Sequence, residues 1–361
     1  MFYRAIGLMS GSSLDGLDIV FAEFNEQGGK WSYEIKAAAC YEYDEQWIER
    51  LKGATQLPAY DYMVLHCNYG KYLGEQVNRF IEEHGLYHQV QLIGSHGHTT
   101  FHAPQKGMTA QLGDGAALAA TTGINVVSDL RNLDIAWGGQ GAPIVPMGEK
   151  LLLSDYALLL NLGGIANISY RNNEEYVAFD ICAANRVLNM LSNLAGKKYD
   201  EDGLMAASGQ IMNDVLEKLN SLEYYQQPHP KSLANEFGSE TVYALLPKDN
   251  IHDSLRTYVE HIAIQIKNAI LTLQTSSSTD QLLITGGGTH NKFLVERIKA
   301  QLQPVAITTV VPDKMLIDYK EALAMALLGV LRWREQNTVM SSVTGAKRDS
   351  IGGAVWIGQE A

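Results

Sequence analysis

Cysteine is scarce in this sequence, and its few cysteines have no metal-binding or redox spacing. The 361 residues include three, Cys40, Cys67 and Cys182, with no C-x-x-C motif. An odd number at unrelated spacings excludes a disulfide framework and a zinc cage. Long apolar runs are missing too, since the longest, Ala322–Leu331, is far shorter than the roughly 20 residues that cross a bilayer. The N-terminus starts no apolar signal segment. We therefore expect a cytoplasmic protein with no membrane partner.

Positive charge is in deficit. Lysine and arginine total 28 residues against 40 aspartates and glutamates, which gives a net charge of -12 and a pI near 5.3. The basic residues form no cluster. Because a negative chain repels phosphate backbones and anionic lipid, nucleic acids and membrane surfaces are not expected partners.

Several familiar enzyme motifs are absent. The sequence has no G-x-x-x-x-G-K-[ST], G-x-G-x-x-G, G-x-S-x-G or H-E-x-x-H. P-loop ATPases, Rossmann dehydrogenases, α/β-hydrolases and zincins therefore lose support.

The composition does provide enough apolar surface for a folded protein of more than one domain. Apolar residues make up 46% of the chain and charged residues 19%, a balance that argues against wholesale disorder. The chain is longer than one hydrophobic core usually supports. At roughly 150 residues per domain, its length predicts two domains.

Two stretches far apart in the chain share a pattern of three short strands joined by turns. The strands are expected over Tyr3–Met9, Leu17–Phe24 and Trp31–Cys40, and again over Tyr156–Asn161, Ile165–Tyr170 and Glu175–Phe179. Helical stretches follow, over Ala59–Glu83 in the first half and over Val187–Ala195 and Ile211–Ser221 in the second. The repeat predicts two α/β halves, each led by a hairpin with a glycine turn.

Two later strands are expected to end in glycine loops. Val90–Ile93 precedes Gly94–Gly97, and Gln281–Ile284 precedes Thr285–Gly288. In open α/β sheets, ligands bind beyond the carboxyl ends of strands, where small residues let backbone N–H groups face an anion. We therefore expect several glycine loops around one cleft, although any single loop could be a simple turn.

These glycine segments resemble one family from Gly7 to Gly353, nearly the whole chain. The specific motifs are Gly7–Asp18 (GLMSGSSLDGLD) and Gly138–Pro143 (GGQGAP). Weaker motifs recur in the family's order: Gly94–Thr99, Asn161–Asn167, Phe179–Asp180, Asp202–Gly203, Gly286–Asn291, Glu321–Ala322 and Val343–Ala346. On these motifs the sequence is similar to the anhydro-N-acetylmuramic acid kinases.

The resemblance implies an α/β fold of two ribonuclease-H-like domains, the actin-like ATPase fold, with an interdomain cleft for ATP and sugar. Domain I would comprise residues 1–137 and 342–361, and domain II residues 138–341. The family hydrolyses the 1,6-anhydro bridge of 1,6-anhydro-N-acetylmuramic acid and phosphorylates O6, which gives N-acetylmuramic acid 6-phosphate in cell-wall sugar recycling. A homodimer is also implied.

The resemblance places ATP against backbone N–H groups and hydroxyls, with Mg²⁺ held by Asp18 through water. The implied nucleotide-binding residues are Gly11, Ser12, Ser13, Leu14, Asp15, Gly16, Leu17, Asp18, Gly163, Gly164, Gly286, Gly287, Gly288 and Asn291. The structural alternatives are a solvated hairpin carboxylate for Asp18 and tight turns for the glycines.

The implied catalytic residues are Asp180, the base that takes a proton from the attacking water, and Glu321 in the sugar site. Their structural alternatives are a turn aspartate at the end of a strand and a carboxylate at a helix N-terminus. The implied substrate-binding residues are His96, His98, Thr99, Arg131 and Asp134. Arg131 and Asp134 could equally form a surface ion pair. A zinc site at His96, His98 and His102 is not expected, because no thiolate or carboxylate completes it nearby.

The sequence departs from the family in two segments near the implied base. The family's Gly-Pro-Gly after Asp-x is here Cys182-Ala183-Ala184, so this backbone must avoid positive φ. The family's Lys-Ser-Thr-Gly-Arg-Glu is here Lys231–Glu236, without the arginine. His98 replaces a glutamine, and Ser12 a threonine.

These changes leave two alternatives: a divergent kinase of another anhydro-amino sugar, or a non-catalytic nucleotide-binding regulator. Retention of the carboxylates of Asp18, Asp180 and Glu321 argues against the regulator.

Overall fold

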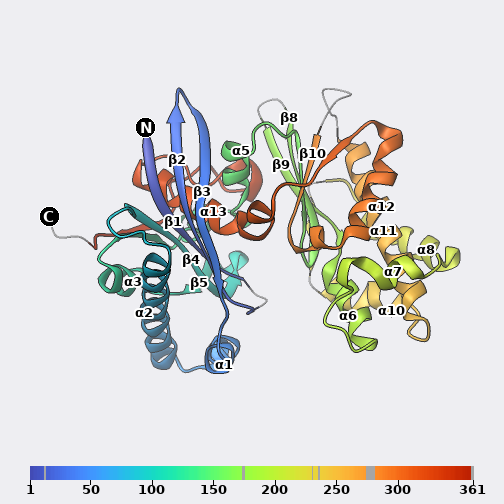
Figure 1. Ribbon diagram of the computed structural model, residues 1–361, viewed down its shortest axis with the longest axis horizontal. Helices are drawn as coiled ribbons and strands as arrows, with labels where there is room; N and C mark the ends of the chain where they lie inside the picture. The colour runs from blue at the N-terminus through green and yellow to red at the C-terminus, as the bar shows by residue number, and fades with distance from the viewer. Residues whose placement is uncertain (12–13, 173–174, 230, 235, 274–280, 359–361) are drawn as a thin grey trace. The chain divides into compact units, whose positions relative to one another are not determined.

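The computed structural model describes residues 1–11, 14–172, 175–229, 231–234, 236–273 and 281–358. The chain forms two compact units, unit 1 with Met1–Ser154 and Tyr319–Ala361, and unit 2 with Asp155–Asp318. Each unit has its own β-sheet with helices packed on it (Figure 1). Unit 1 therefore extends to Ser154 and resumes at Tyr319, whereas the expected domain I ended at residue 137 and resumed at 342.

The sheet of unit 1 has the strand order β12-β6-β4-β1-β2-β3, with β5 paired to β4. The strands are β1 (Phe2–Ser10), β2 (Leu17–Gln27), β3 (Lys30–Tyr41), β4 (Leu92–Ala103), β5 (Met108–Leu112), β6 (Asn125–Ser128) and β12 (Ala354–Trp356). The predicted meander β1–β2–β3 is antiparallel, and Gly28 and Gly29, both with positive φ, form the hairpin turn. β4 runs parallel to β1 and to β6.

Helices pack on both faces of this sheet. On one face, Tyr69 and Phe80 of α2 join Ile6 of β1 in the hydrophobic core. Successive side chains of a strand point to opposite faces, so Gly7 points the other way. There the backbone of α13 lies so close that a Cβ on Gly7 would collide with the Ala322 carbonyl oxygen. The helices are α1 (Glu45–Gly53), α2 (Ala59–Glu83), α3 (Gly115–Thr122), α4 (Asn132–Ala136), α5 (Pro146–Leu152), α13 (Lys314–Trp333, in unit 1 from Tyr319) and α14 (Ser341–Thr344).

The sheet of unit 2 repeats this topology with the order β11-β10-β7-β8-β9. The strands are β7 (Leu158–Leu162), β8 (Ile165–Asn172), β9 (Glu175–Ala183), β10 (Gln281–Thr285) and β11 (Thr308–Val310). The meander β7–β8–β9 is antiparallel, and β10 runs parallel to β7 and β11. Three antiparallel strands followed by two parallel ones in both units confirm the predicted α/β fold of two ribonuclease-H-like domains.

The helices of unit 2 enclose its main core. Tyr258, Ile262 and Ile266 of α11 are fully buried and pack in one cluster with Phe179 and Ile181 of β9. The helices are α6 (Asn185–Leu194), α7 (Leu204–Ser208), α8 (Asn213–Asn220), α9 (Glu223–Gln226), a π-helical turn (Phe237–Val242), α10 (Tyr243–Leu245), α11 (Ile251–Thr272) and α12 (Lys292–Leu302). Across both units, none of the described helices has the length and apolar character needed to cross a membrane.

Candidate active site

In unit 1, a buried chain of hydroxyl groups fixes one of the predicted substrate-binding histidines. Ser10, at the end of β1, pairs in register with His98 of β4, and its Oγ lies 3.1 Å from His98 Nδ1. Tyr43 donates its hydroxyl proton to Ser10 Oγ over 2.8 Å, and its oxygen lies 2.6 Å from that of Tyr69. Neither tyrosine was identified from the sequence, because no motif there links them to β1 or β4.

The predicted glycine loop Gly94–Gly97 is wrong, since these residues lie within β4. Gly94 is required by packing, because a Cβ there would collide with the Met325 carbonyl oxygen of α13. Gly97 has a φ of +72°, and the β1–β4 register shifts between Leu8 and Ser10. The strand therefore continues through a bulge, which sets the directions in which the neighbouring side chains point.

His96 and Arg131 are brought together at this bulge. Arg131 Nε donates a hydrogen bond to His96 Nε2 over 2.9 Å, and His96 Nδ1 donates to the Gly97 carbonyl oxygen over 2.9 Å. Burial and the positive charge of Arg131 lower the pKa of His96 to about 3, so the imidazole is neutral at pH 7. Burial lowers the pKa of Arg131 to about 10, opposed by the charge of Glu321. The site thus holds a neutral histidine, a cation and a nearby carboxylate.

Asp134 lies beside this group, but its carboxylate is held by hydrogen bonds from other parts of the protein. It is fully buried, and its carboxylate accepts hydrogen bonds from the Gly141 N–H over 2.7 Å and from Thr344 Oγ1 over 2.7 Å. The alternative of a surface ion pair with Arg131 is therefore wrong. Thr344 was quoted from the sequence only as part of the Val343–Ala346 motif and was given no role.

Thr99 and His102 lie on the β4–β5 hairpin. Thr99 is exposed, and its Oγ1 accepts a hydrogen bond from Gln111 Nε2 over 3.3 Å. His102 Nδ1 lies 3.1 Å from Thr109 Oγ1. Gln111 is buried, and its Oε1 has no partner among the residues that the structure describes. The hairpin therefore adds an amide that sequence reasoning missed.

The connection from β1 to β2 carries the first predicted nucleotide loop. Ser12 and Ser13 lie outside the described residues. Gly11 is partly buried, Asp15 is exposed, and Leu14 adopts a left-handed φ of +57°.

The end of this connection packs against β3. A Cβ on Gly16 would lie 2.6 Å from Cys40 Sγ, so glycine is needed for the close approach. The Leu17 side chain is buried in the core and leaves only its backbone for a ligand. Asp18 is partly buried and pairs in register with Cys40. Burial and the Asp18 carboxylate raise the pKa of Cys40 to about 12, so this thiol stays protonated.

In unit 2, the two predicted glycine loops lie together at the carboxyl ends of the parallel strands β7 and β10. Asn161 pairs in register with Thr285. Gly286 has a φ of +86°, and a Cβ there would lie 2.6 Å from Asn161 Oδ1. A Cβ on Gly288 would lie 2.8 Å from Asn185 Oδ1. By contrast, no atom of the described residues, chain neighbours aside, lies within 4 Å of a Cβ built on Gly287. Gly286 and Gly288 are thus needed by the fold, whereas Gly287 faces open space.

The Gly163-Gly164 turn is tied to the start of α6. Ala184 N–H donates to the Gly164 carbonyl oxygen over 2.8 Å, and Asn185 N–H to that of Gly163 over 3.1 Å. Asn291, predicted to contact adenosine, caps α12 by accepting a hydrogen bond from Leu294 N–H over 2.9 Å.

Asp180 lies inside β9, three residues before the strand ends at Ala183. The alternative of a turn aspartate at the end of a strand is therefore wrong. Asp180 Oδ2 accepts a hydrogen bond from Leu233 N–H over 2.9 Å, and the Asp180 N–H donates to the Lys231 carbonyl oxygen over 3.0 Å. Burial raises the pKa of the Asp180 carboxyl, and the Leu233 hydrogen bond opposes that rise. The sequence showed residues 231–236 only as a departure from the family.

The altered backbone after Asp180 behaves as predicted. None of residues 181–184 has a positive φ, and β9 continues through Cys182 and Ala183. Cys182 is fully buried, which raises the pKa of its thiol and keeps it protonated.

Glu321 is exposed and lies within α13, which begins seven residues earlier at Lys314. The expectation that Glu321 opens the helix is wrong, and with it the interpretation as a carboxylate at the helix N-terminus. The earlier start was hard to predict, because Lys314, Asp318, Lys320 and Glu321 interrupt the apolar residues that precede the continuous run Ala322–Leu331.

Comparison with known proteins agrees with the motifs. The model of the anhydro-N-acetylmuramic acid kinase family matches residues 3–358. An anhydro-N-acetylmuramic acid kinase of Mannheimia succiniciproducens is 34% identical, with 97% of this chain and 98% of that protein covered. Those of Sulfurimonas denitrificans and Aliivibrio fischeri are each 32% identical, covering 97% and 98% of this chain and 98% and 99% of their own lengths. The chain therefore belongs to the anhydro-N-acetylmuramic acid kinase family, a family of sugar kinases.

Proposed function

We propose that this protein is an ATP-dependent kinase that hydrolyses the 1,6-anhydro bridge of 1,6-anhydro-N-acetylmuramic acid and phosphorylates O6. Its product is N-acetylmuramic acid 6-phosphate, an intermediate of cell-wall sugar recycling. Family membership supports the kinase class and the type of sugar. A cytoplasmic location and a homodimer are further expectations of this proposal.

The environment of Asp180 is the observation that carries the proposal. One carboxylate oxygen, Oδ2, is held by Leu233 N–H, while Oδ1 has no hydrogen-bond partner among the described residues. Burial raises the pKa of this carboxyl above that of an ordinary aspartate. A general base is more effective when its pKa lies closer to the working pH and its geometry is fixed. Asp180 has both properties.

The chemistry asked of Asp180 is one proton transfer. The oxygen of a water forms a bond to C1 of the sugar as the C1–O6 bond breaks, and Asp180 accepts one proton from that water. The freed O6 forms a bond to the γ-phosphorus of ATP, and ADP leaves. The sugar keeps the water oxygen at C1 and gains the phosphoryl group at O6.

The glycine loops fit a nucleotide. Open space at Gly287 lets a ligand approach the backbone, and Gly286 and Gly288 hold that backbone against Asn161 and Asn185. In unit 1, the backbone N–H groups of Gly11 and of residues 14–18 are further donors in this proposal, with Asp18 as an oxygen ligand of Mg²⁺ through water. Mg²⁺ suits this arrangement, because it keeps several waters and takes one or two carboxylates together with phosphate oxygens.

Glu321 and the residues at the β4 bulge serve the sugar in this proposal. Arg131 supplies a cation for an acidic substituent, and the neutral His96 holds the guanidinium in place. His98, fixed by Ser10, offers its Nε2 to a hydroxyl group. Glu321, close enough to influence Arg131, adds an exposed carboxylate.

Mass spectrometry of the product tests the proposal. The protein, ATP, Mg²⁺ and 1,6-anhydro-N-acetylmuramic acid should give a sugar heavier by one phosphoryl group and one water. Faster turnover of another anhydro-amino sugar in a matched panel would assign the enzyme to that sugar. Binding of ATP without turnover of any sugar would favour the non-catalytic regulator.

A further inference from the structure

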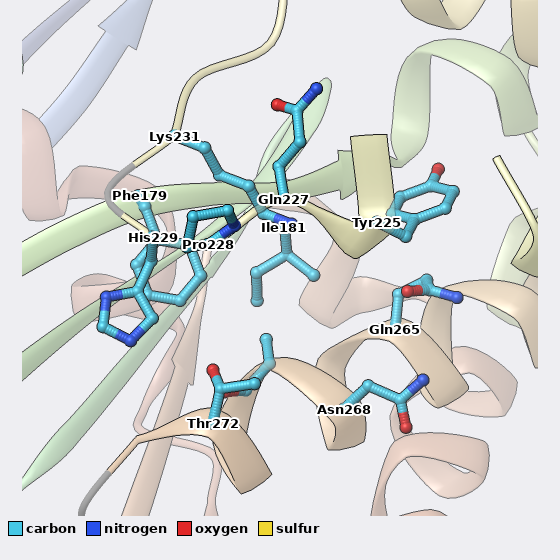
Figure 2. Close-up of a pocket in the computed structure, with 11 residues that line it drawn as sticks. Phe179, Ile181, Tyr225, Gln227, Pro228, His229, Lys231, Gln265, Asn268 and Thr272 are labelled. Carbon is cyan, nitrogen blue, oxygen red and sulfur yellow. The ribbon is translucent and has the colours of Figure 1, made fainter. Parts of the chain in front are cut away.

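Unit 2 contains a cavity on the helical face of its sheet, separate from its glycine loops. The cavity has a volume of about 270 Å³ and lies between β9, α11 and the side chains of Tyr225, Gln227, Pro228, His229 and Lys231. Phe179 and Ile181 of β9 line it, whereas Asp180 between them does not. Figure 2 shows side chains of α11 on one side of the cavity and those of Gln227 and Lys231 on the other. The volume is near the lower end for ligand pockets, which suits a small molecule.

The charge of this cavity differs from that of the whole chain. The chain carries a net charge of -12. None of the described residues lining the cavity is acidic, whereas two, Lys231 and His229, are basic. The basic residues of the cavity would attract an anionic ligand, whereas they would add nothing to the binding of a neutral one.

Among the residues that the structure describes, Lys231 has no counter-ion. Its Nζ donates one hydrogen bond, to the Tyr224 carbonyl oxygen over 3.0 Å, and lies 4.5 Å from the centre of the Tyr224 ring. An ammonium group has three N–H donors. Within the described part of the chain, no carboxylate forms an ion pair with it. Burial lowers the pKa of the Lys231 ammonium, because it disfavours the charged form.

The other residues that line the cavity suit a ligand that carries hydroxyl groups. Phe179 and His229 are stacked, with ring centres 5.0 Å apart and planes 12° apart, and present an apolar face. Gln227, Asn268 and Thr272 bring amide and hydroxyl groups to the same cavity. A sugar ring has the same combination of one apolar face and a rim of hydroxyls.

We propose that this cavity is a second binding site, for a small sugar that carries a carboxylate or a phosphate, with Lys231 as the residue that pairs with the acid group. The site is joined to Asp180 through the chain: the Lys231 carbonyl oxygen accepts the Asp180 N–H over 3.0 Å, and Leu233 N–H donates to the Asp180 carboxylate. A ligand that holds Lys231 therefore also holds the segment that orients Asp180.

Calorimetric titration of the full chain with glucose 6-phosphate and with glucuronate tests this proposal. At least one should bind, with glucose and inorganic phosphate each weaker by about tenfold or more. Binding of glucose 6-phosphate would indicate a preference for a phosphate group, and binding of glucuronate a preference for a carboxylate. Absence of binding by both acids would overturn the proposal, as would inorganic phosphate binding as tightly as glucose 6-phosphate.

Variants locate the binding. Lys231→Met removes the ammonium and keeps the length of the side chain, and Ala269→Leu fills the cavity from α11. Each should weaken binding about tenfold or more, while Lys218→Met, at an exposed lysine of α8, should leave it unchanged. Unfolding midpoints check that the variants are folded. Unchanged affinity in both cavity variants would place the ligand elsewhere and overturn the proposal. Because the titration needs no turnover, its failure is distinct from failure of the proposed kinase activity.

Discussion

The backbone N–H of Leu233 donates a hydrogen bond to Oδ2 of Asp180 over 2.9 Å. Burial raises the pKa of this carboxyl, and among the described residues the Leu233 N–H is the group that lowers it. A hydrogen bond to the charged form favours that form. The basicity that burial gives Asp180 is therefore moderated by a segment 53 residues further along the chain.

Leu233→Pro should move the acid limb of the activity profile to higher pH. Proline has no N–H, so the pKa of Asp180 should rise further, and activity that needs the ionised carboxylate should be lost at a higher pH as pH falls. The measurement is kcat/KM against pH. Leu233→Ala keeps the N–H and should keep the wild-type limb. If the acid limb of Leu233→Pro matched that of the wild type, the limb would not reflect the ionisation of Asp180.

Asp134→Asn should destabilise the protein. Gly141 N–H and Thr344 Oγ1 both donate to the buried carboxylate, and an amide turns one of its two acceptors into a donor. The free energy of unfolding should fall by about 1–3 kcal/mol in urea. Asp249→Asn, at an exposed site, is the control and should stay near wild type. If Asp134→Asn kept full stability and bound the sugar more weakly, Asp134 would be assigned to substrate binding instead.

Gly287→Val should fold normally but bind ATP poorly. Within the described part of the chain, a Cβ on Gly287 meets no atom within 4 Å apart from its chain neighbours, so the side chain costs the fold little and projects into the space assigned to the nucleotide. Calorimetry with ATP and Mg²⁺ should show a sharp loss of affinity with an unchanged unfolding midpoint. Gly53→Val, also at an open glycine and far from the loops in sequence, should bind ATP as wild type does. Unaltered ATP affinity in Gly287→Val would remove the 286–288 loop from the nucleotide site.

The repeated meander was predictable because strand alternation and glycine turns are local signals. The observed α2 has the predicted bounds, Ala59–Glu83, and β10 ends at Thr285, one residue beyond its predicted end at Ile284 and directly before the glycines. The sequence predicts that β4 stops at Ile93, because glycine at position 94 is typical of a turn. Gly94 is instead demanded by the backbone of α13, more than 200 residues away in sequence, and no local pattern carries that contact.

In the candidate site, too, local sequence signals were predictive and tertiary contacts were not. Motifs identified Asp180, Arg131 and His96, but not what surrounds them. Thr344 reaches Asp134 across 210 residues, and Leu233 reaches Asp180 across 53. Such partners depend on tertiary packing, so only the structure could assign Asp134 a buried, internally bonded carboxylate.

Asp180→Asn tests the central claim most directly. The amide keeps the size of the side chain and removes its basicity, so turnover should fall by about 10²–10⁴-fold while ATP and sugar still bind. Reaction in ¹⁸O-labelled water, quenched before the sugar ring exchanges oxygen, should place label at C1 in the wild-type product and very little in the variant. Full turnover and full labelling in Asp180→Asn would contradict the assignment of Asp180 as the base.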